Sequence, residues 1–157
     1  MKHLDEIKNG NYFALYSLPG VNSLQSSFNS LITSHPGFAA DIFLKRANLF
    51  FALVNNYTGI WDDEMDQLIV PADYQVPKML RYFGVLDYSS ELENDVFNCT
   101  MLPSGSLKEV EIRASTIVAC NEIAKRSNKS IANVDYFLWG NRKACSDPFH
   151  LTITTDY

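Results

Sequence analysis

The chain has 157 residues, of which 46% are hydrophobic and 20% are charged, and its formal net charge is −5. This balance is too apolar for a disordered segment, and the length is that of one ordinary domain, so we expect residues 1–157 to form a single domain with a sizeable core. Eighteen acidic against thirteen basic residues argue against direct binding to nucleic acid, which requires lysine and arginine clustered along a groove.

Cysteine usage and the N-terminal residues bear on where the protein works. The three cysteines are odd in number and widely spaced, which is typical of reduced thiols, so we expect a cytoplasmic protein. The N-terminus is polar, and the longest uninterrupted apolar run covers only residues 49–54, so neither a signal peptide nor contact with a membrane is expected.

Metal ligands are poorly represented. The three histidines are far apart, and the acidic cluster at residues 62–66 lacks the glycine and terminal glutamate of a calcium loop, so a solvated helix start is the better interpretation. We therefore expect no metal and no other cofactor.

Hydrophobic spacing is mostly helical and predicts an all-α, compact multi-helix domain. A short amphipathic helix is expected after the breaker Leu18-Pro19-Gly20, followed by a longer helix over residues 38–57 that closes near Gly59. The breaker is similar to the hairpin of helix-hairpin-helix modules, but the usual second glycine is absent, so a plain turn is favoured.

The second half of the chain contains several predicted helix starts. Pro77 fits the first turn of a helix because its missing N–H would be unpaired there anyway. Two serines, each with a glutamate three residues later, are expected to cap further helices: Ser90 with Glu93, and Ser106 with Glu109. The second of these helices should reach about Lys125. Ser130 should cap a short helix that ends at Gly140. Residues 149–155 alternate like a β-strand, but a lone strand has no partner.

Lys45 interrupts the apolar face of the predicted helix over residues 38–57. At about 100° per residue it falls near the middle of the face formed by Phe38, Ile42, Leu49, Ala52 and Leu53. A buried ammonium needs a partner, so Lys45 must extend to the edge of the face, pair with a carboxylate, or line a cavity that receives an anion. The spacing alone leaves these alternatives open.

Asp73 precedes the helix that contains Pro77, where the positive end of the helix dipole favours an ionised carboxylate. A helix cap with no further role is the simpler interpretation of this aspartate.

Two pairs at four-residue spacing lie beside apolar helix faces. Glu109 and Arg113 form one pair, and Asp135 and Trp139 form the other. Pairs such as the first are commonly exposed ion pairs of small energy, and a tryptophan is by default a core residue with its N–H satisfied.

Several segments together resemble the queuosine salvage family of queuosine 5′-phosphate N-glycosylases. The resemblance covers about residues 38–157 and leaves residues 1–37, which we expect to be helical, unmatched. Its matching stretches, in order, are Phe43-Leu44-Lys45-Arg46-Ala47-Asn48, Ala72-Asp73-Tyr74-Gln75-Val76-Pro77, Tyr82-Phe83-Gly84-Val85-Leu86-Asp87-Tyr88-Ser89, Glu109-Val110-Glu111-Ile112-Arg113-Ala114, Asp135-Tyr136-Phe137-Leu138-Trp139 and Pro148-Phe149-His150.

The resemblance implies an α-helical fold akin to the helix-hairpin-helix DNA glycosylases and an N-glycosidase that releases queuine from queuosine 5′-phosphate for the salvage of the modified base. It implies that Asp73 is the catalytic carboxylate, because cleavage builds positive charge on the ribose. Lys45 is implied as a substrate ligand, to the phosphate or the ribose. The remaining substrate-binding residues that we expect are Tyr74, Arg113, Asp135 and Trp139.

Family members are longer than this chain, which keeps other functions open. The alternative is a truncated non-catalytic relative, or one subunit of a split enzyme, that acts as a helical interaction protein. In that case a protein partner or a second copy of the chain would complete the pocket. A DNA repair glycosylase is disfavoured by the acidic balance and by the incomplete hairpin.

Overall fold

The computed structural model describes residues 23–155, and within this range the chain is helical and contains no β-strand, which confirms the predicted all-α class. The predicted turn at residues 18–20 lies outside the described residues. In chain order the elements are α2 (Leu24–Ser34), α3 (Pro36–Ala39), α4 (Lys45–Thr58), the 3-10 helix η2 (Asp62–Gln67), α5 (Gln75–Tyr82), α6 (Ser90–Phe97), α7 (Leu107–Ser127), α8 (Ile131–Gly140) and the short 3-10 helix η3 (Arg142–Ala144).

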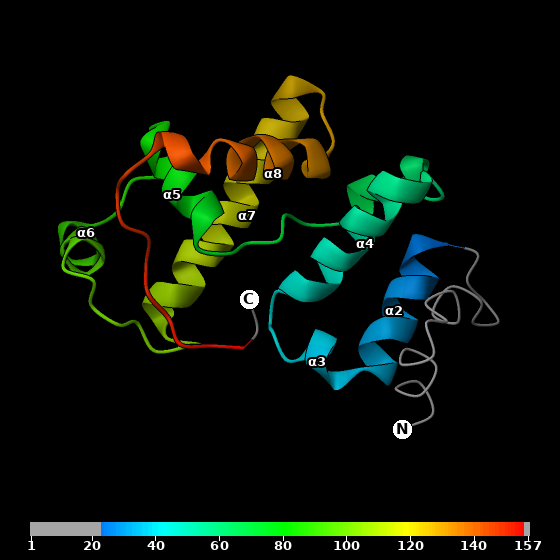
Figure 1. Cartoon of the computed structure of the whole chain (residues 1–157), viewed down its shortest axis with the longest axis horizontal. Coiled ribbons are helices and arrows are strands. Elements are labelled where there is room, and N and C mark those ends of the chain that lie inside the picture. The colour runs from blue at the N-terminus through cyan, green and yellow to red at the C-terminus, as the bar shows by residue number, and fades with distance from the viewer. Residues whose placement is uncertain (1–22, 156–157) are drawn as a thin grey trace.

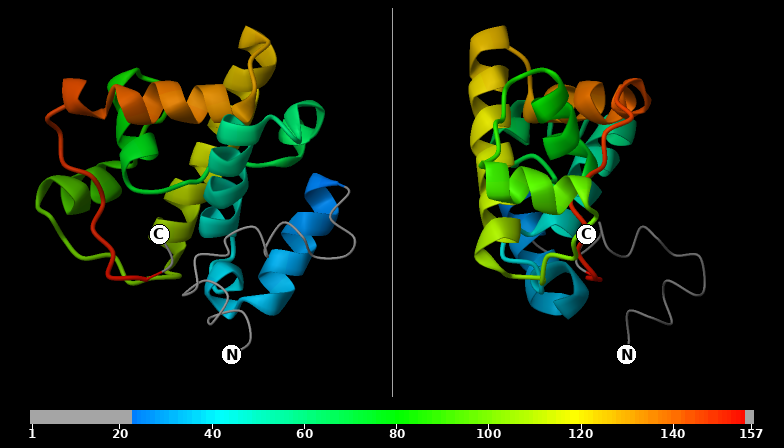
Figure 2. Two further views of the ribbon diagram at one scale, coloured as in Figure 1. Left: turned by 45° about the vertical axis from the view of Figure 1, so that its right-hand side comes forward. Right: turned by 90° about the vertical axis from the view of Figure 1, so that its left-hand side faces the viewer.

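Most of the helices form two groups, with α6 to one side (Figure 1). Each group surrounds its own cluster of buried side chains, and a third, smaller cluster lies between α6 and α7. Helices α2 and α4 pack with η2 around Leu24, Phe51 and Trp61. Helices α5, α7 and α8 pack around Met79, Cys120 and other apolar side chains. Residues 68–74 cross from the first group to the second, as Figure 1 and the left view of Figure 2 show. Asp73 belongs to this crossing segment.

Local capping was predicted well. Ser106 Oγ accepts a hydrogen bond from the Glu109 N–H at 3.4 Å, and Ser130 caps α8 in the same way. Gly59 ends α4 with φ of 65°, a left-handed conformation that glycine adopts without strain. The predicted cap at Ser90 is wrong by one residue, because Ser89 provides the side-chain oxygen for α6.

The predicted continuous helix over residues 38–57 is wrong in its first half. The chain forms α3, breaks, and begins α4 only at Lys45, with Leu44 in a left-handed conformation at φ of 51°. The break has a local cause, because the Asp41 carboxylate accepts hydrogen bonds from the backbone N–H groups of Phe43 and Lys45 and so replaces the helical pattern.

This break also changes which side of α4 meets the core. Its buried residues are Ala47, Asn48, Phe51, Val54 and Asn55. By contrast, Leu53 and Ile42, which were predicted to share the core face with Lys45, are exposed. Lys45 therefore lies beside the buried face of α4 and not in its middle.

The C-terminal segment is extended but is not part of a sheet. Leu151 forms one isolated bridge with Met101, in which the Leu102 N–H donates to the Leu151 carbonyl at 2.8 Å. This single contact holds the segment close to the start of α7 (Figure 1). None of the described helices is long and apolar enough to cross a bilayer.

Candidate functional site

Asp73 is held at the N-terminus of α5 by one of its two carboxylate oxygens. Its Oδ1 accepts hydrogen bonds from the backbone N–H groups of Gln75 at 2.7 Å and Val76 at 3.0 Å. The residue is 8% exposed. Its Oδ2 accepts no hydrogen bond from any residue in the described range. The expected capping role is therefore present, and it leaves one carboxylate oxygen available for another partner.

Lys45 is the first residue of α4 and is half-buried. Within residues 23–155 its ammonium forms no ion pair, so the predicted alternative of an internal pair is not observed there. Its backbone N–H is bound to Asp41, which fixes the point from which its side chain leaves the helix.

The carboxyl group of Asp135 is close enough to both Asp73 and Lys45 for their charges to affect its pKa. The pKa of Asp135 is raised to about 7, chiefly by burial and also by the negative charge of Asp73, while the positive charge of Lys45 lowers it. These electrostatic effects require the three side chains to lie near one another, although they come from α4, the crossing segment and α8. Cys120 lies near Asp135. The pKa of its thiol is raised to about 12, chiefly by burial and also by the charge of Asp135.

Aromatic side chains accompany two of these acidic residues. Tyr74, next to Asp73, is 38% exposed and packs against Phe149, with ring centroids 4.5 Å apart. Trp139 lies one turn beyond Asp135 and is 45% exposed, so its default interpretation as a core residue is wrong. The guanidinium of Arg142 covers the Trp139 ring at 3.4 Å from its centroid. Tyr74 and Trp139 both present ring surface to solvent.

Arg113 lies in the interior of the protein, where it is 2% exposed. It forms the predicted pair with Glu109, at 3.2 Å, and this pair is buried. Its Nη1 and Nη2 atoms also bind the two carboxylate oxygens of Asp41 at 2.8 and 2.5 Å, and its Nε donates to the Ala72 carbonyl at 3.1 Å. Arg113 thus contacts the residue that precedes Asp73.

Sequence reasoning missed Asp41 and Asn48, which connect α4 to the rest of the site. Asn48 Oδ1 accepts from the Ile69 N–H at 3.0 Å, and its Nδ2 donates to the Leu44 carbonyl at 3.0 Å. The signal for Asn48 was a polar residue directly before the apolar run over residues 49–54. For Asp41 it was an aspartate four residues after Gly37 of the Pro-Gly break and four residues before Lys45, which is a spacing suited to a helix start.

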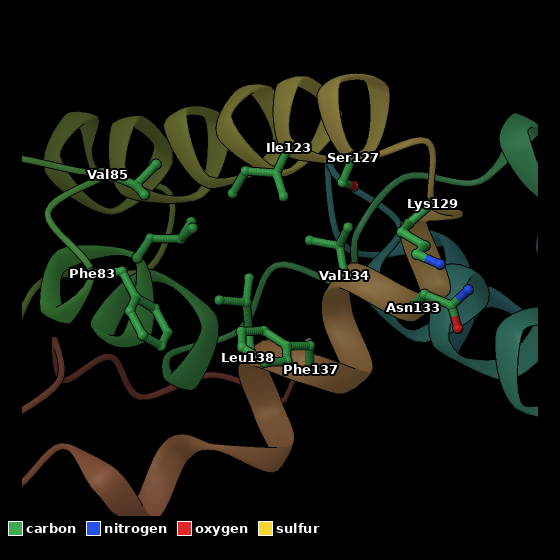
Figure 3. Close-up of a pocket in the computed structure, with 10 residues that line it drawn as sticks. Phe83, Val85, Ile123, Ser127, Lys129, Asn133, Val134, Phe137 and Leu138 are labelled. Atoms are coloured by element: carbon green, nitrogen blue, oxygen red, sulfur yellow. The ribbon is translucent and has the colours of Figure 1, made fainter.

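A separate cavity of about 590 Å³ lies on another side of α8, between α5 and α7 (Figure 3). Its lining is mostly apolar and includes Phe83, Ile123, Val134, Phe137 and Leu138. None of Asp73, Lys45 and Asp135 lines it. In residues 23–155, no group of three or more histidine, cysteine or carboxylate side chains is arranged to hold a metal ion.

Comparison with known proteins finds one family. Residues 39–155 match the sequence model of the queuosine salvage protein family. Three similar relatives carry the name queuosine 5′-phosphate N-glycosylase/hydrolase. They come from Dictyostelium discoideum (34% identical over 130 residues, 73% of this chain and 40% of the relative), Sphaerobacter thermophilus (36% identical over 130 residues, 73% and 39%) and Mus musculus (30% identical over 132 residues, 70% and 39%). The chain therefore spans about 40% of the length of these relatives.

Proposed function

The chain belongs to the queuosine salvage protein family, and we propose from this that it hydrolyses the N-glycosidic bond of queuosine 5′-phosphate and releases queuine. The observation that carries the proposal is that the side chains of Asp73, Lys45 and Asp135 lie near one another. All three residues belong to the segment that matches the family.

Asp73 is proposed as the catalytic carboxylate. In the reaction the bond between ribose C1′ and the base nitrogen breaks, the electron pair leaves with the base, and water forms the new bond to C1′. Positive charge builds on the ribose in this step, and a fixed carboxylate next to it lowers the barrier. Asp73 suits this role because Oδ1 is fixed by two backbone N–H groups while Oδ2 is left to face the ribose or to accept the proton of the attacking water.

Lys45 is proposed to bind the 5′-phosphate. The phosphate is the most negative group of the substrate, and the Lys45 ammonium forms no ion pair with a side chain of the described residues.

Asp135, Tyr74 and Trp139 are proposed to contact the base. A carboxyl group with a pKa of about 7 is substantially protonated at neutral pH and can donate a hydrogen bond to the edge of the base. The partly exposed rings of Tyr74 and Trp139 offer surfaces against which a flat base can stack.

The finer fold and cellular setting are proposed on the same basis. We infer a fold akin to the helix-hairpin-helix DNA glycosylases, supported by the family relationship and by the all-helical architecture. A single domain over residues 1–157 fits the length of the chain. A cytoplasmic location fits the three cysteines, which are free of disulfide bonds.

The alternative function is that of one subunit of a split enzyme, or of a non-catalytic relative that acts as a helical interaction protein. In this case a second polypeptide, or a second copy of the chain, would complete the pocket.

The two functions are separated by incubating the whole chain with an excess of queuosine 5′-phosphate and quantifying queuine by chromatography and mass spectrometry. Many molecules of queuine per protein molecule support the proposed hydrolase. The absence of queuine contradicts it, and queuine that forms only after a co-purified second polypeptide is added identifies a split enzyme. Asp73→Asn should abolish the release of queuine. Asp66→Asn is the matched control for this variant, because Asp66 is an exposed aspartate in η2.

A further inference from the structure

A buried ion pair joins the two segments that carry Lys45 and Asp73. Arg113 and Asp41 bind each other through two hydrogen bonds at 2.8 and 2.5 Å, and both side chains are at most 5% exposed. The Phe43 ring lies 4.8 Å from the guanidinium carbon of Arg113. Such a two-point pair fixes the direction as well as the distance between its members.

Each member of the pair also holds one backbone segment of the candidate site. Asp41 Oδ2 accepts from the Lys45 N–H at 2.9 Å, which sets where α4 begins. Arg113 Nε donates to the Ala72 carbonyl at 3.1 Å, which fixes the peptide that leads into Asp73. A displacement of either side chain would therefore alter the separation between Lys45 and Asp73.

A second connection runs parallel to this one. Asn48 accepts from the Ile69 N–H and donates to the carbonyls of Phe43 and Leu44, so it also links the start of α4 to the crossing segment. The crossing segment is thus attached to α4 through Asn48 and to α7 through Arg113.

We propose that Asp41 and Arg113 are positioning residues, which hold Lys45 and Asp73 in register for the proposed reaction and do not touch the substrate. This inference rests on the proposed function and changes the expected role of Arg113 from substrate ligand to internal support. The support is its burial at 2% exposed and the direction of its donors toward Asp41, Glu109 and Ala72.

A test independent of catalysis uses Asp135 as a reporter. Its titration depends on burial and on the charges of Asp73 and Lys45, while Cys120 is the other titratable group beside it. Carbon-13 NMR of the aspartate carboxyl groups, assigned with Asp135→Asn, should give a midpoint near pH 7 in the parent protein. In Asp41→Asn we expect the midpoint to fall by at least about one unit, because the loosened site admits water.

The matched control is Glu93→Gln, which makes the same charge-removing change in the Arg81–Glu93 pair at 2.9 Å, between α5 and α6. It should leave the Asp135 midpoint in place. An unchanged midpoint in folded Asp41→Asn would overturn the positioning role. If that variant does not fold, the triple variant Asp41→Leu, Glu109→Gln and Arg113→Met leaves none of the three buried charges in place and is measured instead, with the same expectation.

Kinetics then separate positioning from substrate contact. A loss of positioning lowers kcat of Asp41→Asn and Arg113→Lys by about tenfold or more with little change in KM, whereas loss of a substrate ligand raises KM. A rise in KM alone for Arg113→Lys would restore Arg113 as a ligand. A shifted Asp135 midpoint in a chain that releases no queuine would support the positioning pair and refute the proposed hydrolysis, so the two failures are distinguishable.

Discussion

Arg113 and Asp41 form a bidentate ion pair in the protein interior although they lie 72 residues apart in the sequence. The pKa of Asp41 is subject to opposing effects. Burial raises it, but the hydrogen bonds from Arg113 and from the backbone of Lys45, with the Arg113 charge, lower it below its usual value overall. The carboxylate thus stays charged beside the first residue of α4, and the pair contacts the backbone at Lys45 on one side and at Ala72 on the other.

Removing one member of the pair should destabilise the protein strongly. Arg113→Met leaves Asp41 and Glu109 as buried carboxylates without the guanidinium, which typically costs about 3–5 kcal/mol. Urea unfolding followed by circular dichroism measures the change. Glu93→Gln, which breaks a less buried pair, should cost about 1 kcal/mol or less. Equal losses of unfolding free energy in the two variants would contradict the larger contribution to stability expected of the interior pair.

The stability of the protein should depend on pH through Asp135. Its pKa rises from 3.8 to about 7 on folding, so between these values the folded state binds more protons than the unfolded state. The free energy of unfolding contributed by Asp135 therefore falls as pH rises from about 4 to 7. Relative to the parent protein, Asp135→Asn should gain about 2–4 kcal/mol between pH 4 and pH 8, measured by urea unfolding at each pH.

The comparison with Asp135→Asn is necessary because His150 contributes in the opposite direction. Burial lowers the pKa of His150 to about 4, with Glu109 raising it and Arg113 lowering it, so its contribution to stability increases as pH rises from about 4 to 6.5. Both proteins retain His150, and its contribution cancels in the difference. A difference that stays constant across this pH range would contradict the assigned environment of Asp135.

Lys45 should discriminate between substrates with and without the phosphate. Lys45→Met removes one charge-assisted contact, worth about 1.5–3 kcal/mol, so KM for queuosine 5′-phosphate should rise about tenfold or more. The phosphate-free nucleoside should be processed equally by both proteins. Arg46→Met is the control, because Arg46 is the exposed neighbour whose side chain binds the Gly37 carbonyl. Equal effects on both substrates would place Lys45 away from the phosphate.

Features governed by neighbouring residues could be predicted from the sequence. The caps at Ser106 and Ser130 and the end of α4 at Gly59 depend on residues within one turn, and the structure confirms them. The all-α class follows from the same local periodicity. The family relationship came from several short segments in order, and the comparisons confirm it.

Features governed by distant partners could not be predicted. The hydrogen bonds of Asp41 to Phe43 and Lys45 that interrupt the helix are local, but its partner Arg113 lies 72 residues further along the chain and could not be identified from spacing. The spacing of Glu109 and Arg113 showed that they pair, but not that a third side chain and the Ala72 carbonyl share the guanidinium. The site roles of Asp73, Lys45, Tyr74, Asp135 and Trp139 remain predictions.

Substitution of Asp73 by asparagine tests the central claim most directly, because it removes the charge while keeping an oxygen for the N–H groups of Gln75 and Val76. The measurement is the rate of queuine release from queuosine 5′-phosphate, with Asp66→Asn alongside as the exposed control. We predict that Asp73→Asn lowers kcat by about 100-fold or more, since electrostatic support of this kind is worth about 3–4 kcal/mol, and that KM changes little. Queuine release by Asp73→Asn at the parent rate would contradict the assignment of Asp73 as the catalytic carboxylate.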